Sequence, residues 1–115
     1  SRDFLTFREM PWGELYIQPF TGRVLQRAAF SFGTRLEAFR TACTAMGGLP
    51  LQAGDAGFEF TLLGNYRLRM LLWAGDDEFP PSAQLLYSAN FVDGFAAEDR
   101  VVAGDLLCNE IKANL

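Results

Sequence analysis

The 115-residue chain contains no histidine. It therefore lacks the usual general acid–base side chain, the base that activates serine or cysteine nucleophiles, and the most common zinc ligand. The G-x-S-x-G, G-x-G-x-x-G and Walker spacings are missing as well, so neither a nucleophile elbow nor a phosphate-binding glycine loop is indicated. We expect no cofactor, and whether the chain is an enzyme stays open.

Cysteine is scarce, since Cys43 and Cys108 are the only two in the sequence. Both fall on expected helix faces among apolar neighbours, where a free thiol behaves as a small hydrophobic group. Reduced core thiols are the favoured interpretation, with a disulfide and a reactive thiol as alternatives. We expect a cytoplasmic location.

Long apolar runs and clusters of basic residues are also missing. No stretch reaches the ~20 apolar residues that cross a bilayer. Ten basic and fourteen acidic residues give a net charge of −4, which does not suit phosphate neutralisation. We therefore expect binding to neither membranes nor nucleic acid. No signal peptide is visible, and because the sequence starts at Ser1 without methionine, we expect it to be the C-terminal part of a longer chain.

Hydrophobic residues make up half of the chain, and eleven of them are phenylalanines. A chain of this length and composition buries roughly 65 % of its unfolded surface in one core. We therefore predict a single α+β domain over residues 1–115, with a dense aromatic core.

The hydrophobic periodicity predicts about three helices packed on one face of a mainly antiparallel sheet of four or more strands. The helices are expected at 21–32, from Thr34 to the glycines at 47–48, and at 97–113. The strands are expected at 49–53, 58–63, 67–74 and 84–89, after two short extended segments at 4–10 and 14–20.

Two of these helices carry specific local signals. Thr34 and Glu37 have the spacing of a capping box, which predicts the start of the second helix. In the last helix, Val102, Leu106 and the pair Leu107 and Ile111 are expected to line one apolar side.

The strand that ends at Trp73 runs into three adjacent carboxylates, Asp76, Asp77 and Glu78, followed by Phe79 and two prolines. Three interpretations are open. One carboxylate could accept backbone N–H bonds in a structural loop with Phe79 anchoring its exit, the loop could face a partner or ligand, or it could form a metal or acid–base site. The alternating spacing of an EF-hand is missing.

Aromatic residues crowd the first twenty positions: Phe4, Phe7, Trp12, Tyr16 and Phe20. Such a segment fits either a binding surface or a strand pair that seals the core. Arg67 and Arg69 share one strand face, and Arg23 and Arg27 share one helix face. Either pair could clasp a carboxylate ligand or form ion pairs within the chain, for example with the acidic loop.

Two function hypotheses follow. The first is a non-enzymatic accessory or protein-binding domain, whose partner is another protein or a second copy of the chain. The second is a small carboxylate-dependent enzyme or divalent-metal binder that uses Asp76 and Glu78 with Glu9. The candidate binding residues are Trp73, Asp76, Asp77, Glu78, Phe79, Glu9 and Trp12; no metal ligand set is assigned.

Several motifs together resemble one known family. They are residues 7–13 (FREMPWG), the pair Phe32-Gly33, residues 46–48 (MGG), residues 72–80 (LWAGDDEFP) and residues 84–87 (QLLY). The chain resembles, over essentially its whole length, the bacterial and archaeal family of domain of unknown function 3786. It has Ser88 where the family pattern usually has an aspartate, which bears on any role of that aspartate.

The resemblance implies an accessory role near anaerobic redox or one-carbon metabolism. Family members are generally longer at the N-terminus, and some have a preceding cysteine-rich iron–sulfur segment. Residues 1–115 contain no such cluster, because two isolated thiols cannot supply the four that a cubane cluster requires.

Overall fold

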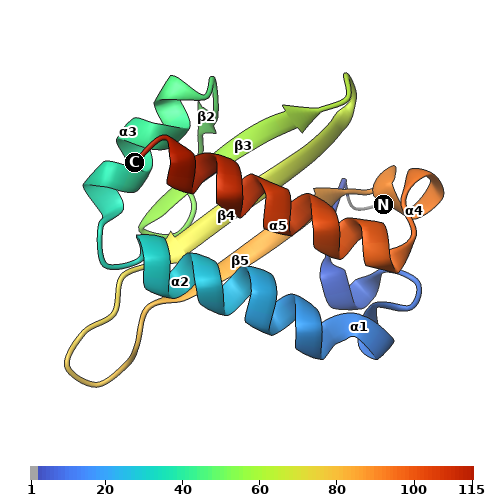
Figure 1. Ribbon diagram of the computed structural model, residues 1–115, viewed down its shortest axis with the longest axis horizontal. Coiled ribbons are helices and arrows are strands. Elements are labelled where there is room, and N and C mark those ends of the chain that lie inside the picture. Colours follow the sequence, from blue (N-terminus) through green and yellow to red (C-terminus); the bar gives the residue numbers. More distant parts are fainter. Residues whose placement is uncertain (1–2) are drawn as a thin grey trace.

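The computed structural model describes residues 3–115 and contains a five-stranded antiparallel sheet in the order β1-β5-β4-β3-β2. The strands are β1 (Phe4–Thr6), β2 (Leu49–Pro50), β3 (Ala56–Leu62), β4 (Tyr66–Trp73) and β5 (Ser82–Ser88). Helices lie over one face of this sheet (Figure 1). The predicted α+β class, the antiparallel sheet and its helical layer are confirmed.

The helical elements differ more from expectation. They are the 3₁₀ turn η1 (Phe7–Glu9), α1 (Gly13–Phe20), the π-helical segment η2 (Thr21–Gln26), α2 (Arg27–Phe32), α3 (Leu36–Ala45), α4 (Phe91–Gly94) and α5 (Ala97–Ala113). The bounds predicted for the last helix, 97–113, are confirmed. The short helix α4 was not predicted.

The prediction that residues 14–20 are extended is wrong. They belong to α1, which continues through η2 into α2, so the predicted helix over 21–32 begins earlier than expected. Pro19 lies inside α1 and has no N–H to donate. The backbone then passes through the wider turns of η2, a common adjustment near such a break. Residues 4–10 are likewise only partly extended, because η1 follows Thr6 directly.

A capping interaction forms at a different place from the predicted one. Helix α3 begins after Arg35, with no side-chain hydrogen bond at its N-cap, and Glu37 pairs with Arg40 instead. At η1, the backbone N–H and the hydroxyl of Thr6 both donate to Glu9 Oε1, at 2.8 and 3.0 Å.

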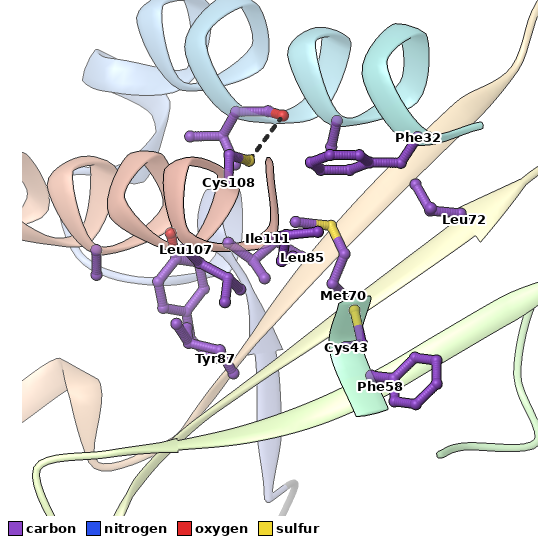
Figure 2. Close-up of a cluster of buried hydrophobic side chains, with 14 of the residues drawn as sticks. Phe32, Cys43, Phe58, Met70, Leu72, Leu85, Tyr87, Leu107, Cys108 and Ile111 are labelled. Atoms are coloured by element: carbon purple, nitrogen blue, oxygen red, sulfur yellow. Dashed lines mark hydrogen bonds between the residues drawn. The ribbon is translucent and has the colours of Figure 1, made fainter. Parts of the chain in front are cut away.

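The core lies between the sheet and its helices (Figure 2). The register pairs Phe58 with Met70, and both side chains are buried under the helices with Leu85 and Tyr87. Tyr87 donates its hydroxyl proton to the carbonyl oxygen of Arg100 at 2.7 Å, tying β5 to α5.

Both cysteines are free and fully buried in this core. Burial raises the pKa of Cys43 to about 12 and that of Cys108 to about 11. These thiols therefore stay protonated near neutral pH and act as apolar core groups, as the reduced-thiol interpretation describes.

Helix α5 departs from its predicted pattern of burial at two positions. Leu107 and Ile111 are buried as predicted, but Val102 and Leu106 are 50 % and 59 % exposed. The prediction that the four residues line one apolar side is wrong, because Val102 and Leu106 lie on the exposed side of the helix and Leu107 and Ile111 on the buried side.

Candidate functional site

The acidic loop connects β4 to β5 and is held by hydrogen bonds from one of its own carboxylates. Asp76 Oδ1 accepts the backbone N–H groups of Glu78 and Phe79, both at 2.8 Å, and the Asp76 N–H donates to the Phe79 carbonyl at 2.8 Å. An aspartate that caps the following backbone in this way stabilises a tight turn. Asp76 thus has the role that the structural-loop interpretation describes.

These hydrogen bonds also set the charge state of the loop. The N–H groups of Phe79 and Glu78 lower the pKa of the Asp76 carboxyl, since they stabilise its ionised form. Asp77 and Glu78 are exposed and their carboxylates form no ion pair with residues 3–115. The loop therefore keeps two carboxylates available for contacts outside the chain.

Phe79 does not anchor the loop exit as expected, because its ring is exposed. The loop instead borders an open hollow of about 520 Å³, which Gly33 and Thr34 line from the helical side. Gly75 fits closely against Pro81, and a Cβ at Gly75 would lie 2.6 Å from the Pro81 nitrogen. A larger residue at position 75 would therefore disturb the loop backbone.

Trp73 ends β4 beside this loop, on the sheet face opposite the helices. Its strand neighbours on that face are Leu71 and Arg69, and Arg69 pairs in register with Leu86. No helix within residues 3–115 covers this face (Figure 1). The open face of the sheet carries the accessible apolar side chains Phe4, Leu49, Trp73 and Leu86, whereas Leu71 on the same face is only 9 % exposed.

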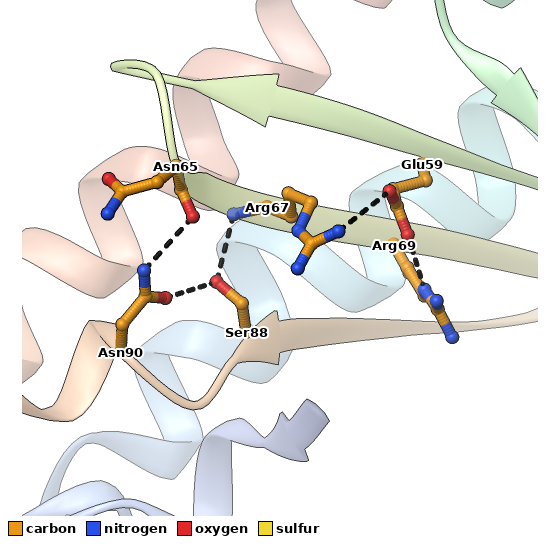
Figure 3. A network of polar contacts seen from close by, with 6 residues as sticks. All are labelled: Glu59, Asn65, Arg67, Arg69, Ser88 and Asn90. Carbon is orange, nitrogen blue, oxygen red and sulfur yellow. Dashed lines mark hydrogen bonds and ion pairs between the residues drawn. The ribbon is translucent and has the colours of Figure 1, made fainter. Parts of the chain in front are cut away.

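A charged cluster lies at the centre of the open face (Figure 3). Glu59 is only 9 % exposed and accepts from Arg69 Nε at 2.8 Å, while Arg67 Nη1 lies 3.9 Å from its other oxygen. The Arg69 guanidinium stacks on the Phe4 ring, 3.8 Å from its centroid. Arg67 and Arg69 therefore form ion pairs with Glu59 in β3, and not with the acidic loop.

Ser88 lies beside this cluster and links neighbouring segments. Its hydroxyl accepts the Arg67 backbone N–H at 2.9 Å and donates to Asn90 Oδ1, and Asn90 donates to the Asn65 carbonyl at 3.0 Å (Figure 3). In this chain, position 88 thus holds strands together through a neutral side chain.

Glu9 and Trp12 are not brought to the acidic loop. Glu9 lies in η1 and bonds to Thr6, and Trp12 precedes α1 with an exposed ring and a left-handed backbone (φ 65°). The α1 end of the molecule lies far from the β4–β5 loop in Figure 1. Phe7 and Phe20 of the aromatic segment are buried and stacked, with ring centroids 4.2 Å apart. The proposed grouping of Asp76 and Glu78 with Glu9 thus has no contact to support it.

Arg100 is a buried arginine that no sequence pattern indicated. Arg100 is 2 % exposed, and its Nη2 donates to the Pro11 carbonyl at 2.6 Å, while Nε and Nη1 have no hydrogen-bond partner within residues 3–115. Arginine is normally exposed, so composition gave no signal for it.

Residues 3–115 offer neither a group of metal ligands nor a membrane-spanning helix. No three side chains of the metal-ligating types converge there on a point that could hold an ion. No helix in the same range is long and apolar enough to span a bilayer.

The comparison with protein families agrees with the resemblance seen in the motifs. The family described as Domain of unknown function (DUF3786) matches residues 1–110. The chain belongs to this family. Neither the curated proteins nor the solved structures include a significant match to it. Family membership therefore identifies no reaction.

Proposed function

We propose that this member of the family is an accessory domain that binds another protein through the open face of its sheet, defined by Phe4, Leu49, Trp73 and Leu86. The observation that carries the proposal is that helices cover one face of the sheet while apolar side chains populate the other. An antiparallel sheet with one solvated face normally alternates apolar with polar residues. Apolar residues on the outward face favour a protein partner.

The charged cluster supports specificity at this face. Glu59 is paired within the domain with Arg69 and Arg67, so a partner meets a preformed cluster with one net positive charge and does not have to desolvate a lone carboxylate. Trp73 and Phe4 provide rigid aromatic area at opposite ends of the face, and such residues contribute strongly at interfaces. Asp77 and Glu78 extend the surface with negative charge beyond Trp73.

The alternative of a carboxylate-dependent enzyme or metal binder has weaker support, because Asp76 is engaged by its own turn and Glu9 by Thr6. The link to anaerobic redox or one-carbon metabolism remains part of the proposal as an implication of the resemblance. The partner under this proposal is a protein, with a second copy of the chain as the competing occupant.

The test compares partner capture by matched surface variants. Leu49→Lys and Trp73→Gln alter positions of the open face that are 60 % and 38 % exposed, and Phe30→Gln alters a position on α2 that is 61 % exposed, as the control. A true partner is retained from source-cell lysate by the wild type and Phe30→Gln, is lost with both face variants, and then binds the purified domain directly. If no protein follows this pattern and the domain sediments as a monomer, the proposal fails.

A further inference from the structure

Helix α5 displays two large apolar side chains that the fold leaves uncovered. Val102 and Leu106 are one helical turn apart and are 50 % and 59 % exposed. They belong to the helical layer, whereas the surface proposed above is the opposite face of the sheet. Their exposure therefore needs a separate explanation.

Next to Leu106 the surface opens into an apolar pocket of about 320 Å³. The principal apolar side chains that line it are Met46, Phe60, Leu62, Leu68, Leu106 and Leu107. The pocket exists because α3 ends at Ala45 and the chain turns away at Gly47 (φ 81°), so the far part of β3 has no helix above it except α5. We call the pocket together with Val102 the α5 groove.

The charge around the α5 groove is of one sign. Glu110 lines the pocket, and Asp99 lies at the other end of the exposed stripe on the same side of α5. Neither carboxylate forms an ion pair within residues 3–115. Eleven residues of helix separate them, which corresponds to roughly 16 Å along the axis. An occupant with basic groups at that separation would satisfy both.

The backbone around the groove favours a helix over an extended strand. Strand β2 pairs with Phe58 and Glu59, so β3 has only Phe60–Leu62 beyond it, fewer residues than a typical added strand requires. The backbone N–H and C=O groups of α5 are hydrogen-bonded within the helix and offer no edge to an added strand. A helix satisfies its own N–H and C=O groups and can insert apolar side chains without needing backbone partners.

We infer that the α5 groove binds an amphipathic helix of a partner protein, with apolar residues at i, i+3 or i+4, and i+7 inserted at the pocket and beside Val102, and with Lys or Arg residues facing Asp99 and Glu110. This second docking surface does not depend on the open face of the sheet. Either surface can fail its test without affecting the other.

The test uses three fluorescein-labelled 18-residue model peptides. The first is an Ala-rich helix with leucines at i, i+4 and i+7 and lysines eleven residues apart; the second has glutamates in place of the lysines; the third has the same composition with the leucines scattered around the helix. Binding is measured by fluorescence anisotropy at low and high salt. The protein variants are Leu106→Gln, Glu110→Lys and, as controls, Leu15→Gln and Gln18→Lys at exposed positions of α1.

The basic amphipathic peptide should bind the wild type more tightly than the other two. Leu106→Gln should weaken it at least about tenfold, since a buried leucine is lost from the interface. Glu110→Lys should weaken the basic peptide and improve the acidic one, and both controls should bind like the wild type. Equal binding of all three peptides, or unchanged binding by Leu106→Gln and Glu110→Lys, would overturn the inference. Concentration-dependent self-association that Leu106→Gln abolishes would also overturn it, because the occupant would then be a second copy.

Discussion

Arg100 is the largest of the fully buried side chains, and its charge has no carboxylate partner within residues 3–115. Burial lowers the pKa of its guanidinium, yet an arginine retains its proton, so desolvation of the charge opposes folding. One hydrogen bond to Pro11 and the Phe7 ring, 5.8 Å from the guanidinium carbon, offset this only in part. An apolar side chain of similar length at position 100 would pack without the cost of desolvating a charge.

We therefore expect Arg100→Met to unfold in urea at the same or a higher denaturant concentration than the wild type. Arg100→Ala should lose about 2–4 kcal/mol, because it removes the buried aliphatic stem and leaves a cavity. If Arg100→Met is as destabilised as Arg100→Ala, the guanidinium has a favourable interaction that the contacts above do not include.

In the acidic loop, the Asp76 carboxylate contributes to stability in a pH-dependent way. The Phe79 and Glu78 N–H groups lower the pKa of Asp76 in the folded state below the unfolded value of about 3.9. Asp76 therefore stabilises the fold above about pH 3.9, and this contribution disappears as the pH falls through the folded pKa. Asp76→Ala should be less stable than the wild type at pH 7, with the gap closing toward pH 2 in thermal melts. Asp77→Ala removes the neighbouring exposed carboxylate and none of these hydrogen bonds, so it is the matched control, and an equal loss of stability in both variants at pH 7 would contradict the role of the Asp76 hydrogen bonds.

The contact between α5 and η2 depends on the absence of a side chain at Gly104. A Cβ at this position would meet both Val24 methyl groups at 3.0 Å and Leu85 at 3.1 Å. Alanine would gain about 1 kcal/mol in helix propensity but would overpack a buried contact at a cost of about 1–3 kcal/mol. Gly104→Ala should therefore lower the free energy of unfolding, and adding Val24→Ala should destabilise less than additively.

Gly22 provides the matched control, because it lies in η2 and a Cβ added there would meet no atom within 4 Å. Gly22→Ala should stabilise the domain by up to about 1 kcal/mol. A Gly104→Ala variant that gains as much as Gly22→Ala would show that the α5–η2 contact tolerates the extra methyl group.

The elements that the sequence predicted well are those whose pattern is long. The strand at 67–74 and the helix at 97–113 each contain enough periodic residues to decide their type. Residues 14–20 do not, since Leu15 and Ile17 alternate with polar neighbours as a strand would. Their helical state depends on contacts distant in sequence, above all Phe20 against Phe7 and Tyr87.

In the candidate site, too, only the features that depend on neighbouring residues could be predicted from the sequence. An Asp76 turn followed from neighbouring residues, whereas the placement of Glu59 between Arg67 and Arg69 needed the β3–β4 register. The exposure of Val102 and Leu106 could not be predicted from the sequence for another reason. Helical periodicity groups apolar residues on a face, but only the packed structure determines how wide a stripe the neighbours cover.

At the scale of the whole molecule, one core contains both thiols, so alkaline pH should act on global stability. Burial raises the pKa of Cys43 to about 12 and of Cys108 to about 11, whereas thiols in the unfolded chain ionise near pH 8.5. Between these values the unfolded state releases protons that the folded state keeps, so stability falls as pH rises. At pH 10 the expected loss is about 1.5–2 kcal/mol per thiol relative to pH 7.

Urea unfolding at pH 7 and pH 10 measures this loss directly, and Cys43→Ala/Cys108→Ala provides the control. The double variant starts less stable, because it removes two packed sulfur atoms, but it should lose about 3–4 kcal/mol less than the wild type between the two pH values. Tyr87, whose pKa is raised mainly by burial and to a smaller extent by Cys108, remains in both proteins, so most of its pH-dependent loss is common to them. If both proteins lose the same stability, the thiols are not the groups that couple this core to alkaline pH.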